Sequence, residues 1–241
     1  MKSYKGRGIV LHTLKYGDTS LVAHVLTDVW GRRSYMVQGV RSQRGHGSKL
    51  ALFQPMFPLE FEGLESPHRQ MDRFREVRLG LTLENLPFDV RKTTIAMFMA
   101  ETLYRLIRES EPNEELFRFV WDSVGALDAL ERGVSNFHLW FLVNLSLLLG
   151  FRPGNDYRPG CWFDTREGLY TPTPPLHPGG MEPSEASLLA ELLGFEVGRL
   201  DELELNRERR GRFLTAMLNY YGYHLEGMGL VRSADILREV F

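Results

Sequence analysis

The chain has 241 residues, 43% hydrophobic and 25% charged, which is typical of a soluble globular protein with one large or two modest cores. Its longest apolar stretch, residues 137–151, is shorter than a membrane span, which takes about 20 residues. Residues 1–8 do not show the pattern of a secretory leader. The one cysteine excludes an intramolecular disulfide and a cysteine-based zinc cluster. The net charge of −2 hides an asymmetry, because residues 1–80 carry 13 basic and 7 acidic side chains whereas residues 81–241 carry 16 and 24. This favours a polyanion-binding face in the first part, with chance asymmetry on a solvated surface as the alternative.

The first eighty residues predict a small β-barrel. Strands are expected at residues 8–16, 20–27, 32–38, 53–63 and 71–78, where β-branched and aromatic residues lie between turn residues. Pro55 and Pro58 confine the fourth strand to an edge or a bulge. Five short strands without a helical repeat suit the OB-fold, a five-stranded barrel. Residues 39–50, between the third and fourth strands, are rich in glycine and basic residues and contain no acid.

From residue 85 onward the apolar residues follow a helical period. Helices are expected near residues 95–107, 113–130, 135–149, 184–193, 206–225 and 233–241, with Asn113 as the N-cap of the second. The segment 135–149 is apolar on nearly every side and should lie at the centre of a bundle. Residues 152–181 are rich in Pro and Gly and have no period. The expected fold class is α+β, with an all-β OB-fold barrel (residues 1–80) followed by an all-α domain (residues 81–241).

The basic residues of the barrel are the candidate nucleic-acid contacts, because phosphates are bound by cations along a groove. A solvated charged loop without a partner is the alternative. Most barrel aromatics should fill the core, but Trp30 lies in a turn and Tyr35 lies close to two arginines, so both are candidates for base stacking. The expected DNA-binding residues are Arg7, Lys15, Trp30, Arg32, Arg33, Tyr35, Arg41, Arg44 and Lys49.

No pattern in the sequence predicts catalysis. Residues 45–49 (GHGSK) faintly resemble a phosphate-binding loop, but serine precedes lysine and no helix is expected to follow. The seven histidines form no ligand pair of the HExxH kind, and no nucleophile–base pattern occurs. We therefore expect no enzymatic activity, no catalytic residue, no cofactor and no metal ligand.

A basic cluster, NRERRGR at residues 206–212, begins a helix in the acidic part of the chain. Such a run is usually a solvated face. It could instead bind an acidic peptide tail, because Arg pairs well with carboxylates. The candidate partner-binding residues are Arg207, Arg209, Arg210 and Arg212.

Three stretches resemble the bacterial RecO family of recombination mediators. They are GIVLHTLKYGDTSLVAHVLTDVWGRRSYMVQGVRSQ at residues 8–43, LALFQPMFPLEFE at residues 50–62 and YYGYHLEGMGLVRSADILREVF at residues 220–241. Their order and spacing extend the resemblance over essentially the whole chain. The resemblance implies an N-terminal OB-fold and a C-terminal helical domain, binding of single- and double-stranded DNA, and annealing of complementary strands. It also implies partnership with RecR, contact with the acidic tail of the single-stranded-DNA-binding protein SSB, and help in loading RecA in gap repair of the RecF pathway.

One departure from the family concerns zinc, since many members carry a four-cysteine site in the second domain. The matching residues 152–181 keep only Cys161, although Phe163, Asp164 and Gly168 survive. We expect no zinc here and expect aromatic and proline packing to hold the segment.

The sequence therefore predicts a non-enzymatic, cytoplasmic, nucleoid-associated DNA repair and recombination mediator that binds phosphates without reading bases. The alternative is a scaffold whose barrel binds a protein partner and touches DNA incidentally, because OB-folds host unrelated functions.

Overall fold

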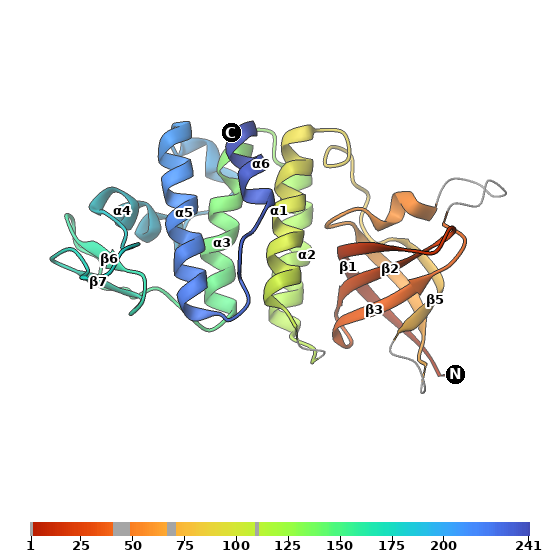
Figure 1. Cartoon of the computed structure of the whole chain (residues 1–241). Coiled ribbons are helices and arrows are strands. Elements are labelled where there is room, and N and C mark those ends of the chain that lie inside the picture. Colours follow the sequence, from red (N-terminus) through yellow and green to blue (C-terminus); the bar gives the residue numbers. More distant parts are fainter. Residues whose placement is uncertain (1, 41–48, 67–70, 109–110) are drawn as a thin grey trace. The chain divides into compact units, whose positions relative to one another are not determined.

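The computed structural model describes residues 2–40, 49–66, 71–108 and 111–241. It divides into two compact units, residues 1–128 and 129–241. The first unit contains a β-barrel and two long helices, and the second contains the remaining helices and a two-stranded sheet (Figure 1). The expected domain limits at residues 1–80 and 81–241 stay a prediction, although the last barrel strand ends at Leu79. Among the described residues, no helix combines the length and the hydropathy needed to cross a bilayer.

Five strands close into a barrel in the order β1-β2-β3-β5-β4, with β4 pairing back onto β1. This confirms the expected OB-like barrel. All of these pairs are antiparallel except β3 with β5, which is parallel and joined only at Tyr35–Asp72 and Met36–Arg73. The strands are β1 (Ser3–Tyr16), β2 (Ser20–Thr27), β3 (Gly31–Val37), β4 (Pro58–Leu64) and β5 (Asp72–Leu79).

β1 begins five residues before the expected start at residue 8, because it serves two neighbours. Its first part pairs with β4 and its second part with β2, and both partners meet at Gly8. A Cβ atom on Gly8 would lie 2.5 Å from Val25 Cγ1, so only glycine allows the strand to pass this closely over β2. The glycines that suggested a strand boundary instead let one long strand curve around the barrel.

The fourth strand is shorter than expected, and its predicted first residues are wrong. Lys49–Phe53 form a 3-10 helix, η1, and the strand begins only at Pro58. Proline has no N–H to donate to a sheet, so it is tolerated at the first residue of a strand. Met56, just before it, has a φ of 63° and donates its N–H to Val10 O over 2.7 Å, which ends the preceding segment against β1.

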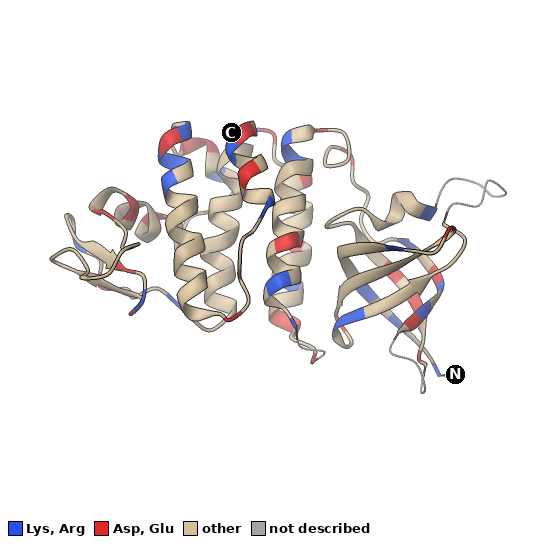
Figure 2. Cartoon of the chain, in the orientation of Figure 1, with Lys and Arg blue, Asp and Glu red and all other residues tan. Residues whose placement is uncertain are grey.

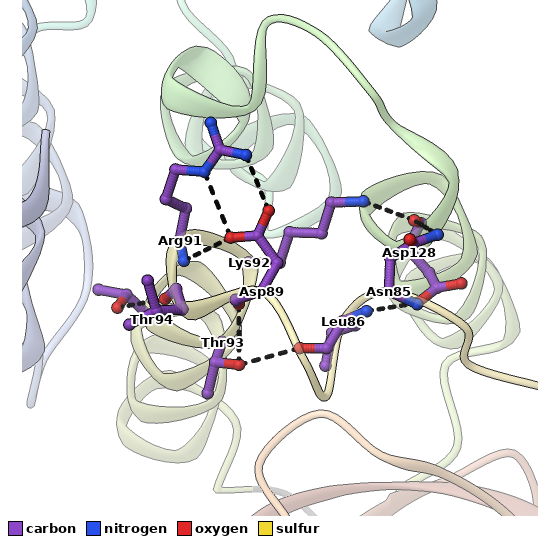
Figure 3. Close-up of polar contacts among 9 residues, drawn as sticks. Asn85, Leu86, Asp89, Arg91, Lys92, Thr93, Thr94 and Asp128 are labelled. Atoms are coloured by element: carbon purple, nitrogen blue, oxygen red, sulfur yellow. Dashed lines mark hydrogen bonds and ion pairs between the residues drawn. The ribbon is translucent and has the colours of Figure 1, made fainter.

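Two helices complete the first unit, α1 (Val90–Leu106) and α2 (Glu114–Ala129). Asn113 Oδ1 accepts the N–H of Leu116 over 2.9 Å, which confirms the expected N-cap of α2. Asp128, near the end of α2, accepts three consecutive backbone N–H groups, those of Glu84, Asn85 and Leu86, over 2.6–3.0 Å. Lys92 Nζ donates to the backbone oxygen of Asp128 over 2.6 Å, so the segment before α1 is tied to the end of α2 (Figure 3).

The second unit is built around α3 (Phe137–Leu148), which confirms its expected central position. Phe137, Leu139, Phe141, Leu142 and Leu145 are all fully buried. Tyr221 of α5 donates its hydroxyl hydrogen to Leu142 O over 2.6 Å, which fixes the two helices along their length. The other elements are the 3-10 helices η2 (Val134–Asn136) and η3 (Val197–Glu202), α4 (Pro183–Leu192), α5 (Arg207–His224) and α6 (Ser233–Val240).

The aperiodic residues 152–181 contain a short hairpin that the sequence did not predict. It pairs β6 (Trp162–Asp164) with β7 (Leu169–Thr171), and Phe163 also exchanges backbone hydrogen bonds with Met181. Strands of three residues are too short to show an alternating pattern, so periodicity could not predict this hairpin.

Candidate nucleic-acid interface

Arg7, on β1, is engaged within the first unit but stays accessible. Its Nε lies 3.2 Å from Asp28 Oδ2, and its backbone N–H donates to Asp28 Oδ1 over 2.8 Å. The guanidinium also lies 5.5 Å from the ring centroid of Phe117 and 5.3 Å from that of Trp121. About half of the side chain is exposed (52%), so a phosphate can still reach it.

Arg33, on β3, has a structural role, because its charge is paired within the first unit. Its Nη1 lies 3.0 Å from Asp72 Oδ2, and its side chain is 28% exposed. The same carboxylate accepts the Tyr4 hydroxyl over 2.9 Å and the N–H of Ser66 over 3.1 Å. Burial raises the pKa of Tyr4 to about 12; the hydrogen bond with Tyr35 opposes this shift and the hydrogen bond to Asp72 adds to it, so Tyr4 stays a hydrogen-bond donor at neutral pH. The network surrounds the narrow parallel contact between β3 and β5.

Arg32 points to the opposite face of β3 and holds the end of α1. Its Nη1 donates to Tyr104 O over 2.7 Å, and its guanidinium lies 5.1 Å from the centroid of the Tyr104 ring. Burial is the main cause that lowers the pKa of this guanidinium, although it remains charged at any physiological pH. The sequence did not indicate that Arg32 would contact a helix 72 residues away.

The two predicted stacking residues have different environments. Tyr35 is fully buried, and its ring stacks on Phe74 with centroids 4.2 Å apart. The prediction that Tyr35 offers its face to a base is therefore wrong, because alternation along β3 points it into the barrel. Trp30 is partly exposed in the β2–β3 turn, and the Arg33 guanidinium covers its ring at 4.7 Å.

Lys15 and Lys49 are both exposed. Neither makes an ion pair or a side-chain hydrogen bond within the part of the chain that the structure describes. Lys15 lies near the tip of the β1–β2 hairpin, and Lys49 begins η1. The backbone of Val40 donates to Thr19 O over 3.0 Å, so the chain that leads into residues 41–48 starts beside that hairpin tip. Arg41 and Arg44 lie outside the described residues.

The sequence did not indicate three arginines of β5 as candidates: Arg73, Arg75 and Arg78. They border a cavity of about 1130 Å³ on the barrel. Arg75 is the extra residue of a bulge, since Glu62 pairs with Glu76 and Gly63 pairs with Phe74. Acids alternate with these cations (Figure 2), and Arg75 and Arg78 form ion pairs of 2.9 and 2.6 Å with Glu62 and Glu60. The charged residues that line the cavity are Lys5, Arg7, Lys49, Arg73, Arg75 and Arg78, with Asp28, Glu60, Glu62 and Glu76. The signal that could have revealed them is the repeated arginine of the last strand, DRFREVRL.

The predicted partner-binding arginines lie in the first turns of α5, where they contact the second unit itself. Arg207 donates to Arg238 O, and Arg210 donates to Leu205 O and, over 2.8 Å, to Phe241 O. Arg212 pairs with Glu185 over 3.0 Å and with Glu208 over 3.2 Å. The side chain of Arg209 makes a long contact, with its Nη2 3.5 Å from Ser184 O.

Beside these arginines is a second cavity of about 440 Å³. Its apolar walls include Leu214, Leu237 and the ring of Phe241, and it is also bordered by three arginines and one acid, Arg207, Arg210, Arg238 and Glu208. His138 forms part of the wall, and burial beside Arg210 lowers its pKa to about 3, so the imidazole is uncharged at neutral pH. A mostly apolar hollow with three guanidinium groups suits an anionic ligand that also has an apolar group.

Residues 152–181 do not fit a zinc site. Cys161 is the chain's one thiol, and the described residues contain no group of three or more His, Cys, Asp and Glu side chains placed to hold a metal ion. The hairpin is held by other contacts, chiefly His177 Nε2 with Asp164 Oδ1 at 2.8 Å and Tyr223 Oη with Pro178 O at 3.0 Å. The expected aromatic packing is also found, since the rings of Phe163 and Tyr170 lie 5.1 Å apart.

Comparisons with known proteins agree with this architecture. The family model described as Recombination protein O N terminal matches residues 1–80, and that described as Recombination protein O C terminal matches residues 87–233. A curated relative from Phocaeicola vulgatus, called DNA repair protein RecO, is 39% identical over 235 residues, which are 97% of each chain. Relatives of the same name from Bacteroides fragilis and Flavobacterium psychrophilum are 37% and 31% identical over 97% and 98% of each chain. The chain therefore belongs to the RecO family of DNA repair proteins.

Proposed function

We propose that this member of the RecO family is a recombination mediator that binds single- and double-stranded DNA without reading sequence. It anneals complementary strands and, with RecR, helps to load RecA on DNA coated by SSB. The observation that carries the proposal is a family match over nearly the whole chain, joined to a closed OB-like barrel with exposed Lys15 and Lys49. Its place of action is the cytoplasm, on the nucleoid.

The proposed mechanism uses binding energy alone, with no bond made or broken. Each Lys or Arg that contacts a phosphate releases condensed counterions, which gives affinity that is independent of sequence and falls with salt. Lys15 and Lys49 supply such contacts, together with Arg41, Arg44 and the accessible part of Arg7. Arg32 and Arg33 contribute less, because both already hold other parts of the first unit.

The first test is a salt titration of oligonucleotide binding, followed by fluorescence anisotropy. Replacing Arg41, Arg44 and Lys49 together by alanine should weaken binding and reduce the salt slope by about two, since each phosphate contact on a single strand contributes about 0.7. The control replaces three surface arginines of other elements, Arg118, Arg132 and Arg199, which removes the same charge. An unchanged slope in the first variant would refute the assignment of these residues. Annealing of complementary oligonucleotides coated with SSB then tests the mediator activity itself.

A scaffold function remains the alternative, and one observation favours it. Arg7, Arg32 and Arg33 all have partners within their own unit, which reduces the cationic surface left for DNA. A scaffold would bind oligonucleotides only in dilute buffer and without measurable annealing. A mediator would anneal SSB-coated strands at moderate salt.

We further propose that the acidic tail of SSB binds at the cavity beside α5 and α6. Arg207, Arg210 and Arg238 would meet its carboxylates, and the apolar walls would take an apolar side chain of the tail.

A labelled peptide with the sequence of the SSB tail tests this site. Arg238→Ala should weaken peptide binding about tenfold, because a charge-assisted hydrogen bond contributes about 1.5–3 kcal/mol. Arg199→Ala, an exposed arginine of η3 paired with Glu202, is the matched control. Equal peptide affinity for the two variants would exclude this cavity.

A further inference from the structure

The outer face of the β1–β2 hairpin carries a row of flat and apolar side chains. Register places His12 opposite His24, Leu14 opposite Val22, and Tyr16 opposite Ser20. Because side chains alternate along a strand, His12, Leu14 and Tyr16 share one face of β1. Tyr35 and the barrel core lie on the other face, so this row is separate from the barrel interior.

The end of this row near the hairpin tip is open. Tyr16 is 56% exposed and Leu14 is 48% exposed, although both are large apolar side chains next to each other on one face. Lys15, between them in the chain, is also exposed, but alternation points its side chain to the other face of β1. Exposed aromatic rings of OB-folds bind unpaired bases by stacking.

The other end of the row is a cluster of rings that α1 completes. The imidazoles of His12 and His24 are stacked with centroids 6.0 Å apart, and the Tyr104 ring lies 4.7 and 5.1 Å from them. Ser34 Oγ lies 2.9 Å from His24 Nδ1, which orients that imidazole. Tyr104 itself is partly exposed, so the row ends as it begins, with a tyrosine that solvent reaches.

The charges around the row are mostly positive. Arg32 lies against Tyr104, and Arg108, just after α1, is exposed. Glu101, the nearby acid of α1, is paired with Arg105 over 2.7 Å. Along β1, the five residues from His12 to Tyr16 span about 13 Å, a length that accommodates about four stacked nucleotides.

We infer that an unpaired segment of DNA lies across this face, with bases stacked on Tyr16 and Tyr104 and phosphates near Arg32 and Arg108. This rests on the proposed DNA binding and specifies which face of the barrel takes a single strand. In a duplex the faces of the bases are already stacked on one another, so the row favours single strands. Leu14 and the two imidazoles line the path between the tyrosines.

The test compares Tyr16→Ala with the intact protein on three probes: a thymidine oligonucleotide, an abasic oligonucleotide of equal length and charge, and a duplex. The variant should bind the thymidine probe about tenfold more weakly, since one base–aromatic contact is lost. The dependence of its affinity on salt should not change, and its affinity for the abasic and duplex probes should equal that of the intact protein. Tyr16→Trp should restore the affinity for the thymidine probe.

Phe88→Ala is the matched control, because Phe88 is an aromatic side chain that is 83% exposed in the same unit. If intact protein binds none of the probes, the proposed function fails. If the intact protein binds DNA and Tyr16→Ala binds each of the three probes as tightly as the intact protein does, the proposed DNA binding stands but its assignment to this face is wrong. An equal loss on the thymidine and abasic probes would also overturn the inference, because the contact would then not involve bases.

Discussion

The guanidinium of Arg33 donates to the carboxylate of Asp72 over 3.0 Å, at the place where β3 and β5 form their parallel contact. Asp72 is nearly fully buried, with 4% of its side chain exposed. An arginine that the sequence suggested for phosphate binding is therefore also part of the barrel's closure.

Arg33→Ala should reduce the free energy of unfolding by about 2 kcal/mol, because a buried carboxylate loses a charged donor. Urea unfolding measures this change. Arg78→Ala is the control, since Arg78 pairs with Glu60 but is 80% exposed, and an exposed ion pair contributes only about 0–1 kcal/mol. Equal destabilisation by the two substitutions would show that the Arg33–Asp72 pair has no special structural role.

Asp128→Asn should destabilise the first unit and change its acid sensitivity. Burial raises the pKa of Asp128, but the N–H groups of Leu86, Glu84 and Asn85 outweigh this and hold it below the usual 3.8. Its stabilising contribution is therefore present above pH 3.8 and is lost as the pH falls through the lowered value. The intact protein should lose stability over this acid range more steeply than the variant in thermal melts. Asp122→Asn, at an exposed position of α2, should behave like the intact protein.

His177→Gln should destabilise the hairpin of residues 152–181 in a pH-dependent way. Hydrogen bonding to Asp164, and then to Pro178 O, raises the pKa of His177 above 6.5. The stabilisation is therefore complete below pH 6.5 and is lost as the pH rises through the raised value. Melting temperatures of the two proteins should differ by a few degrees at mildly acidic pH and converge at alkaline pH. Glu167→Gln is the control, and a gap that stayed constant with pH would exclude the ion pair.

The two stacked histidines, His12 and His24, should make stability depend on pH in the opposite direction from His177. Burial under Tyr104 lowers the pKa of both imidazoles, with Glu101 opposing the shift at His12, and His12 and Arg32 adding to it at His24. Stability should therefore decrease as the pH falls below 6.5, because the unfolded chain binds protons first. Replacing both by Gln should flatten this part of the profile. A profile with the same slope in the double variant would refute the prediction.

Periodicity predicted the barrel and the helices well because those signals are local. Ser20–Thr27 was predicted as a strand with the bounds the structure has, and α5 and α6 lie within one residue of expectation. The errors lie where a distant residue decides the local structure. Gly8 continues a strand because β2 passes close by, and the hairpin of β6 and β7 depends on Met181 and His177.

The sequence by itself determined the fold class, the central apolar helix and the family, because alternation, helical period and motif order are properties of the chain read in line. It also identified most of the basic residues that are candidates for DNA contact. Only the tertiary structure decided which cations are occupied: Arg33 closes the barrel, Arg32 holds α1, and Lys15 is exposed. The physical reason is that a charge is a property of one residue, whereas its availability depends on partners that only folding brings within a few ångströms.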